Sequence, residues 1–268
     1  MNRLYIAALI LLMGCGDAEN SPETPEETTT PSVTTGVKPL SFSVISRIPH
    51  DTGSYTQGLE IVDGKIYEGT GDYEQSALQI CDRKTGAILQ KQVMGSSSIF
   101  GEGITVFKNN LYQLTWTSNK VFVYDKKDIT KPIKTLSWPY EGWGITHDST
   151  HLYVSDGSAN IHMVDPETFR VLNTFSIRDE FGPVENLNEL EYINGSIFAN
   201  VYTKNTIVQI DPVSGNVIGR MQLDNLLQPN EIIPERTDVL NGIAYDSSSQ
   251  SLIITGKRWP AYFELRLQ

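Results

Sequence analysis

A short motif that recurs five times is the sequence feature that most constrains the fold. Each copy carries a polar or aromatic residue, then glycine or once glutamate, then leucine or isoleucine. The copies are Gln57-Gly58-Leu59, Glu102-Gly103-Ile104, Trp143-Gly144-Ile145, Asn188-Glu189-Leu190 and Asn241-Gly242-Ile243. They recur every 41 to 53 residues, the period range of four-stranded propeller blades. The repeat predicts an all-β fold, a five-bladed β-propeller.

Each repeat also shows the strand and turn signals of a blade. The motif opens a first strand, and a turn rich in Asp, Asn, Gly or Ser separates it from a second strand of β-branched and aromatic residues. Two more strands follow in the first four repeats, whereas the fifth ends at Tyr262 to Leu267 after three. The alternating segment Ser41 to Ile48 belongs to no repeat, so we expect it to close the last blade as its outer strand.

The first fifteen residues have the pattern of a secretion signal. Asn2-Arg3 precede an apolar run, Leu4 to Met13, that is shorter than the roughly 20 residues a transmembrane helix needs. Leu12-Met13-Gly14-Cys15 resembles the bacterial lipoprotein box, in which the signal is cut before the cysteine and the thiol is lipidated. We therefore expect lipidation at Cys15. A soluble secreted protein cleaved nearby is the alternative.

The chain divides into three parts by composition. Residues 1–15 form the lipoprotein signal peptide, and residues 16–37 are acidic, rich in Ser, Thr and Pro, and without aromatic side chains. Such a segment buries too little apolar surface to fold, so it is predicted to be a disordered tether. Residues 38–268 form the propeller domain. We expect an exported protein, anchored by lipid to a bacterial envelope membrane on the periplasmic face or cell surface.

Charge and cysteine content restrict the partners. The formal net charge is −11 and no cluster of Lys or Arg is present, so nucleic acid is not an expected partner, and we expect a monomer. Lipidation of Cys15 leaves Cys81 alone, so no disulfide framework is possible. Cys81 lies in an apolar run, and we expect a buried small side chain there rather than a nucleophile.

Propeller geometry brings the motifs together at one mouth of the central channel. The first strand of each blade is innermost, so the opening residues of the motifs line one rim, and the ends of the second strands return to it. This mouth gathers Gln57, Glu102, Trp143, Asn188 and Asn241 with Trp116, Tyr202 and Lys257. Polar groups and large aromatic rings converging on an axis are typical of a small-ligand pocket. Glu102 is the one acid among the opening residues.

These motifs resemble those of the β-propeller glutaminyl-peptide cyclotransferases of plants and bacteria, also called glutamine cyclotransferases. The resemblance covers the whole propeller domain and keeps the motif order. It runs through Tyr55-Thr56-Gln57-Gly58-Leu59, Phe100-Gly101-Glu102-Gly103, Gln113-Leu114-Thr115-Trp116, Glu141-Gly142-Trp143-Gly144, Ser155-Asp156-Gly157-Ser158, Leu187-Asn188-Glu189-Leu190-Glu191, Asn241-Gly242-Ile243-Ala244 and Thr255-Gly256-Lys257.

The resemblance implies an aminoacyltransferase that converts the N-terminal glutamine of peptides or proteins to pyroglutamate and releases ammonia. It also implies that no cofactor and no catalytic zinc is required, so no metal ligand is assigned. Of the four histidines, His147 and His151 flank a predicted hairpin turn. We expect these two to be solvated turn residues rather than ligands.

Carried over residue by residue, the resemblance makes Glu102 the catalytic acid and a proton shuttle. The alternative role for Glu102 is a structural partner of Lys257. Tyr202 stands where the family commonly has a third tryptophan, and Trp138 and Trp259 are expected to pack in the scaffold. The substrate-binding residues implied are Tyr55, Gln57, Phe100, Trp116, Trp143, Asn188, Tyr202, Asn241 and Lys257.

Two other function classes remain open from the residues themselves. A noncatalytic cell-surface propeller that binds peptides or glycans has the same fold, and so has a structural lipoprotein that assembles through its side edges. The single acid in an otherwise neutral ring favours the enzyme, because proton transfer needs it and binding does not. Assembly through the edges leaves the channel residues unexplained.

Overall fold

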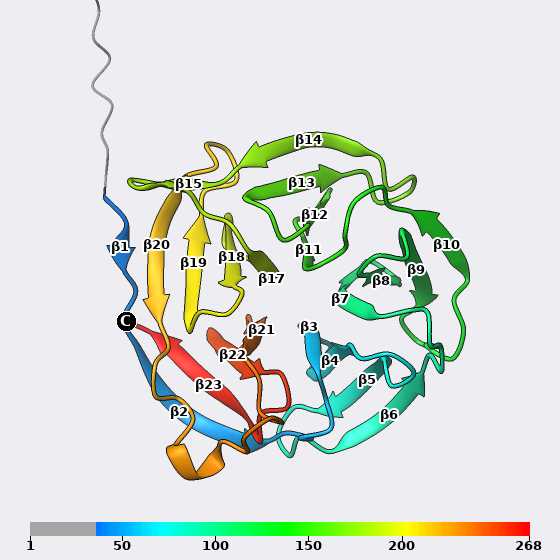
Figure 1. The fold of residues 1–268 in the computed structure, drawn as a ribbon, viewed down its shortest axis with the longest axis horizontal. Helices are drawn as coiled ribbons and strands as arrows, with labels where there is room; N and C mark the ends of the chain where they lie inside the picture. Colours follow the sequence, from blue (N-terminus) through cyan, green and yellow to red (C-terminus); the bar gives the residue numbers. More distant parts are fainter. Residues whose placement is uncertain (1–35) are drawn as a thin grey trace, which may run out of the picture. The chain divides into compact units, whose positions relative to one another are not determined.

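The structure, a computed structural model, describes residues 36–268; the predicted signal peptide and nearly all of the predicted tether lie outside the described residues. Five sheets of at least four strands surround a central axis, as a five-bladed β-propeller (Figure 1). The predicted fold class is confirmed. Among the described residues, no helix is long and apolar enough to cross a membrane.

Each blade runs from an inner to an outer strand. The first blade is β3 (Thr56–Val62), β4 (Lys65–Thr70), β5 (Ala77–Asp82) and β6 (Ile88–Val93), and the second is β7 (Gly101–Phe107), β8 (Asn110–Thr115), β9 (Lys120–Asp125) and β10 (Lys134–Ser137). The third is β11 (Ile145–His147), β12 (Leu152–Ser155), β13 (Asn160–Val164) and β14 (Val171–Ser176), and the fourth is β17 (Leu187–Ile193), β18 (Ser196–Val201), β19 (Thr206–Ile210) and β20 (Val217–Gln222). The last is β21 (Leu240–Asp246), β22 (Ser251–Gly256), β23 (Ala261–Leu267) and β2 (Phe42–Pro49).

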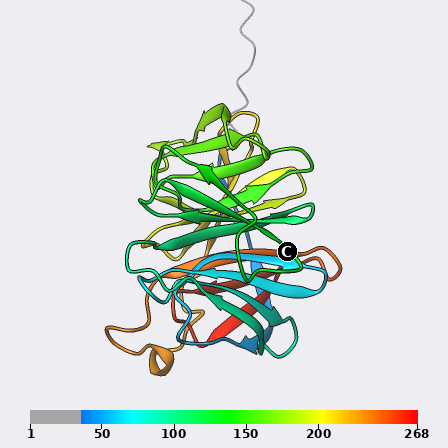
Figure 2. The same cartoon turned by 90° about the vertical axis from the view of Figure 1, so that its right-hand side faces the viewer.

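Two further elements connect blades. The hairpin β15 (Arg178–Asp179) and β16 (Gly182–Pro183) lies between the third and fourth blades in the sequence. The 3-10 helix η1 (Pro229–Glu231) follows the fourth blade, and its loop, orange at the lower left of Figure 2, projects from the ring.

The ring is closed by the N-terminal segment. β2 pairs antiparallel with β23 as the outer strand of the last blade, which confirms the predicted closure. β1 (Lys38–Pro39) adds a contact that the repeat pattern does not predict, because it pairs parallel with β20 at the outer edge of the preceding blade. One continuous segment therefore joins two neighbouring blades and covers their exposed edges.

Neighbouring inner strands approach closely, and glycine makes this possible. A Cβ added at Gly58 would lie 2.3 Å from the amide nitrogen of Ile104, and one added at Gly144 would lie 2.0 Å from the carbonyl oxygen of Asn188. The aliphatic residue that ends each motif comes next in the chain and is buried between blades. These residues are Leu59, Ile104, Ile145, Leu190 and Ile243. The motif thus combines a close backbone approach with a packed core.

The inner strands also need acceptors for backbone N–H groups that face the axis, where no further strand pairs with them. Side chains of other blades supply them. Glu189 is fully buried and accepts from the N–H of Leu59 at 3.0 Å and of Ile243 at 2.8 Å. Glu60 accepts from the N–H of Val106 at 2.7 Å. These bonds tie separate blades together across the channel.

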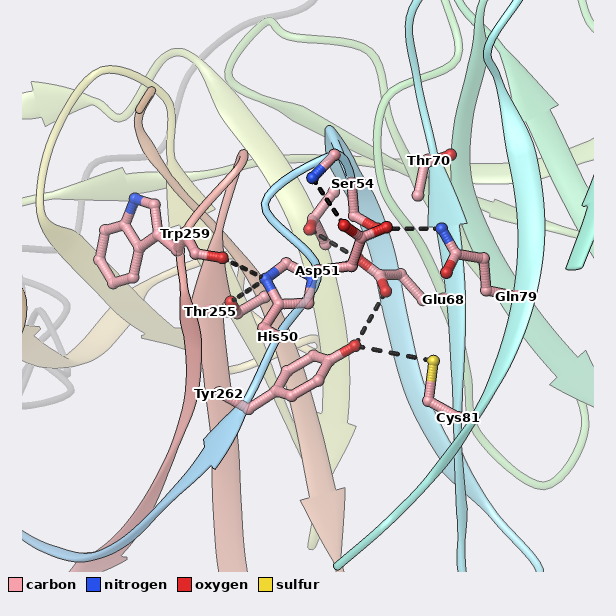
Figure 3. A network of polar contacts seen from close by, with 12 residues as sticks. His50, Asp51, Ser54, Glu68, Thr70, Gln79, Cys81, Thr255, Trp259 and Tyr262 are labelled. Atoms are coloured by element: carbon pink, nitrogen blue, oxygen red, sulfur yellow. Dashed lines mark hydrogen bonds and ion pairs between the residues drawn. The ribbon is translucent and has the colours of Figure 1, made fainter. Parts of the chain in front are cut away.

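A second network joins the last blade to the first (Figure 3). The buried His50 ring lies 3.0 Å from a carboxylate oxygen of Glu68 and 2.7 Å from the carbonyl oxygen of Trp259. Thr56 and Tyr262 donate hydrogen bonds to the same carboxylate, at 2.7 and 2.9 Å. Both imidazole nitrogens face oxygen acceptors, an arrangement that favours the doubly protonated, positively charged ring.

Cys81 lies at the edge of this network, 4.0 Å from the Tyr262 hydroxyl. Burial raises the pKa of its thiol to about 12. The prediction of a buried side chain is confirmed, and the raised pKa disfavours the thiolate that a nucleophile requires.

The charges of the His50–Glu68 pair set a pH window for its contribution to stability. Burial opposes the charge of His50, but Glu68 outweighs it and holds the pKa above its ordinary value of 6.5. Burial likewise opposes the charge of Glu68, but His50 and three hydrogen bonds hold that pKa below 4.5. The His50 contribution is complete below pH 6.5 and fades as pH rises through the folded-state pKa. The Glu68 contribution is complete above pH 4.5 and fades as pH falls.

We predict that Glu68→Gln destabilises the protein by about 3–5 kcal/mol near pH 5.5, because it leaves a buried cation without its partner. The loss should become smaller at pH 8, where His50 is less protonated in the folded protein. Chemical denaturation of both proteins at the two pH values measures this.

Asp63→Asn is the control, because Asp63 pairs with Lys126 at 3.0 Å but is 74% exposed. Its effect should stay within about 1 kcal/mol. A Glu68→Gln loss that is the same at pH 5.5 and pH 8 would contradict the assignment of charge to His50.

Candidate active site

One mouth of the channel holds a pocket of about 230 Å³. This is below the range of about 300–1,000 Å³ typical of drug-sized ligands, so its size fits a single residue or small molecule. Nine of the ten residues predicted for the site line it: Tyr55, Gln57, Phe100, Glu102, Trp116, Trp143, Asn188, Tyr202 and Lys257.

Local strand geometry aims the polar side chains into this pocket. The pairing of the first and second strands slips by a bulge at Gln57, Glu102, Asn188 and Asn241. A bulge bends its strand and re-aims one side chain. The recurring motif is therefore the sequence of this bulge, which explains why a polar residue stands next to glycine at the start of an inner strand.

Glu102 is the buried acid of the pocket, 5% exposed. Its hydrogen-bond donor is the Gln57 amide, at 3.0 Å. Burial raises the pKa of this carboxyl well above its usual value; the positive charge of Lys257 opposes the rise and the negative charge of Glu141 adds to it. Within residues 36–268 no cation lies within ion-pair distance of Glu102. Such a carboxyl exchanges protons more readily near neutral pH than an ordinary glutamate.

Lys257 is held by aromatic rings rather than by a carboxylate. Its ammonium lies 4.8 Å from the ring centres of both Tyr55 and Tyr202. Burial lowers the pKa of Lys257, while Glu102 and Asp238 oppose that change. Glu102 and Lys257 therefore do not form an ion pair in the described part of the chain. The two charges act on each other through space.

Asn241 is the one predicted site residue that does not line the pocket. It is fully buried behind Gln57, where its amide donates to the Gln57 side-chain oxygen at 3.1 Å and to the Thr56 carbonyl at 3.0 Å. The prediction of substrate contact by Asn241 is corrected by this geometry. Its bond to the oxygen turns the Gln57 nitrogen toward Glu102, so Asn241 orients a pocket residue.

The aromatic walls are packed edge to face. The ring centre of Trp116 lies 5.9 Å from Phe100, and that of Trp143 lies 5.5 Å from Tyr202. Two glycines give the rings room. A Cβ added at Gly71 would lie 2.2 Å from the Phe100 ring, and one added at Gly157 would lie 2.5 Å from the Trp143 indole.

Asn188 presents an acceptor that the protein leaves free. The residue is 2% exposed, and within the described part of the chain its side-chain oxygen has no hydrogen-bond partner. A buried polar atom without a partner is unfavourable unless a ligand satisfies it. Because Asn188 also lines the pocket, this oxygen is an acceptor available to a ligand N–H group.

Two acids near the site were missed by reasoning from the sequence, which counted a single acid in the ring. Glu189 occupies the position that is glycine in the other four motifs and lies buried at the axis. Glu141 stands two residues before Trp143 and accepts hydrogen bonds from both pocket tryptophans. The glutamate in place of the glycine of the other four motifs was a sequence signal for Glu189. The bond from Trp116 to Glu141 depends on tertiary structure and has no such signal.

Other features predicted from the sequence fall outside the pocket. Trp138 and Trp259 are buried in the core, as predicted. His147 is not simply solvated, because it lies 3.5 Å from a carboxylate oxygen of Glu60. Within residues 36–268 no group of three His, Cys, Asp or Glu side chains is arranged to hold a metal ion.

A larger groove of about 520 Å³ lies beside the β15–β16 hairpin. Of its two lining acids, Asp179 is paired with Arg220 and Glu185 is exposed to solvent, so this groove offers no buried free carboxyl for proton transfer. The smaller central pocket combines such a carboxyl with apolar walls, and it is the better candidate for chemistry.

Comparison with known proteins identifies the family of this chain. A glutaminyl-peptide cyclotransferase of Arabidopsis thaliana is 35% identical over 229 residues, which is 85% of this chain and 71% of the relative. The crystal structure of Myxococcus xanthus glutaminyl cyclase superposes with a TM-score of 0.80 at 31% identity, covering 87% of this chain and 98% of that one. A family model described as glutamine cyclotransferase matches residues 10–267, and the chain belongs to the glutamine cyclotransferase family.

Proposed function

We propose that this protein is a glutaminyl-peptide cyclotransferase, which converts an N-terminal glutamine to pyroglutamate and releases ammonia. The observation that carries the proposal is Glu102, a buried carboxyl with a raised pKa and no paired cation among the described residues. It lies in an aromatic pocket of about 230 Å³, which fits one residue at the end of a peptide.

In this reaction the α-amine of the substrate glutamine attacks the carbon of its own side-chain carboxamide. The new nitrogen–carbon bond closes the five-membered ring, and the bond from that carbon to the amide nitrogen breaks. Glu102 takes a proton from the attacking nitrogen and gives it to the departing one, so that neutral ammonia leaves. No net proton is gained or lost, and the proposal needs no cofactor because one carboxyl serves both transfers.

The other pocket residues hold the substrate in the cyclising shape. Trp116 and Trp143 are apolar walls that fold the side chain back toward the α-amine. The free Asn188 oxygen accepts a hydrogen bond from the amine or from the carboxamide. Lys257 faces the peptide carbonyl oxygens. Burial of the polar groups beneath the aromatic walls also strengthens these contacts.

We predict that Glu102→Gln lowers kcat by about 10²–10⁴-fold, because glutamine keeps the shape of the side chain but does not carry a proton. The fold should be kept, and substrate binding should change little. Ammonia release from a peptide that begins with glutamine measures kcat, and the melting temperature of the same preparation reports the fold.

Glu167→Gln is the control, because Glu167 is exposed and lies in the turn between β13 and β14, at the opposite end of the blade. It should leave both quantities unchanged. A Glu102→Gln protein that melts early yet turns over normally would end the catalytic assignment. Binding without turnover by the unmodified protein would favour a noncatalytic propeller.

The charge of Lys257 gives a second prediction, on pH dependence. Burial raises the pKa of Glu102 and the lysine opposes this, so Lys257→Met should raise it further. Because Glu102 accepts a proton as a carboxylate, the acidic limb of kcat/KM should move to higher pH. A pH–rate profile of both proteins measures the shift, and a limb that stays in place or moves to lower pH would contradict it.

We also propose that the protein is exported and anchored by lipid at Cys15 to a bacterial envelope membrane. The support is sequence alone: the lipoprotein-box resemblance at Leu12-Met13-Gly14-Cys15 and the polar segment 16–37 that follows. These residues lie outside the part that the structure describes, apart from Gly36 and Val37. Such an anchor holds the domain at a membrane surface without crossing it.

We predict that Cys15→Ser moves the protein from the membrane fraction to the soluble fraction and abolishes incorporation of labelled palmitate, because serine lacks the thiol that is lipidated. Cys81→Ser is the matched control and should remain with the membrane, since Cys81 is buried in the propeller. Membrane association of Cys15→Ser equal to that of the unmodified protein would refute the anchor.

A further inference from the structure

The two tryptophan walls of the pocket share one acceptor. One carboxylate oxygen of Glu141, Oε2, accepts a hydrogen bond from the Trp116 indole at 2.7 Å and from the Trp143 indole at 2.9 Å. Both tryptophans line the pocket, whereas Glu141 is outside the lining and exposed to solvent. A single oxygen therefore fixes the polar edges of two rings that come from different blades.

The loop that carries Glu141 is itself held in place. It joins β10 to β11, and the buried Trp138 indole donates a hydrogen bond to the Glu141 carbonyl at 3.0 Å. The next residue, Gly142, donates its N–H to the Trp116 carbonyl at 3.0 Å. The loop backbone beside the carboxylate is thus bonded to the core through Trp138 and to the pocket wall through Trp116, so Glu141 holds the rings from a fixed point.

Each ring is restrained only partly by other groups. Trp116 meets Phe100 edge to face but is 38% exposed. Trp143 rests on Gly157 and meets Tyr202. Both indole N–H groups point to Glu141, and a charged acceptor makes these hydrogen bonds stronger than those to a neutral group. Loss of the carboxylate frees both rings to turn about their side-chain bonds.

We infer that Glu141 is a positioning residue for cyclisation, which holds Trp116 and Trp143 at the spacing that keeps a glutaminyl side chain folded against its own amine. This inference rests on the proposed function and adds a residue that touches neither the substrate nor the reacting atoms. The negative charge of Glu141 has a second effect, because it contributes to the raised pKa of Glu102. The titratable groups that act on each other around Glu102 are Glu141, Lys257 and Tyr55, and Asp238 acts in turn on Lys257 and Tyr55.

Two substitutions separate the hydrogen bonds from the charge. Glu141→Gln keeps an oxygen that accepts from both indoles but removes the charge, whereas Glu141→Ala removes both. We expect Glu141→Ala to lower kcat/KM by about 10- to 100-fold, since small displacements of positioning groups have effects of this size. Glu141→Gln should keep most of the kcat/KM that Glu141→Ala loses. Both variants should move the acidic limb of the pH profile to lower pH, opposite to Lys257→Met.

The solvent accessibility of the tryptophan rings gives a second measurement. Acrylamide quenching of tryptophan fluorescence should increase in Glu141→Ala and remain near the original level in Glu141→Gln, while Glu167→Ala changes neither quenching nor turnover. Unchanged kcat/KM in Glu141→Ala would overturn the inference. Glutamine and alanine variants that are equally impaired would also overturn it, because the hydrogen bonds would then have no role.

Failure of the proposed function is distinguishable from failure of this inference. If the unmodified protein releases no ammonia from several glutamine-initiated peptides, the activity is wrong. The quenching difference between the alanine and glutamine variants still decides whether Glu141 holds the rings. Equal quenching in all three proteins would overturn the positioning role in either case.

Discussion

The inner edges of five sheets face one another across a narrow axis, and their backbone N–H groups must find acceptors there. A buried N–H without a partner is strongly unfavourable. Glycine lets the strands approach, and side chains of other blades then accept the exposed donors, most directly Glu189, which bonds to the strands of two blades. The propeller is held at its centre by hydrogen bonds between blades as much as by the apolar layers between them.

The same inner edge produces the site. Bulges at the start of the inner strands direct Gln57, Glu102 and Asn188 into one small pocket. Burial removes water from the Glu102 carboxyl and so raises its pKa. The nearby lysine is held by tyrosine rings instead of the acid, so Glu102 has no ion-pair partner among residues 36–268.

Ring closure and the site are physically connected. Asn241, on the last blade, orients the Gln57 amide on the first blade, and Gln57 in turn donates to Glu102. Thr56, next to Gln57, donates to Glu68 in the charged network at the same boundary. The position of the amide that contacts the acid therefore depends on the junction of the last and first blades.

The sequence alone determined the propeller, its closure by residues 41–48 and seven of the nine pocket residues, because a regular repeat and strand alternation are local signals that fix which residues reach the rim. The other two, Tyr55 and Phe100, were predicted from the resemblance of their motifs to those of the family. Only the tertiary structure decided how those residues contact one another. Asn241 proved to lie behind Gln57, Lys257 to lie between two tyrosine rings, and Glu141 to join two tryptophans. Depth of burial and hydrogen-bond direction depend on side chains from separate blades, and no local pattern in the chain encodes them.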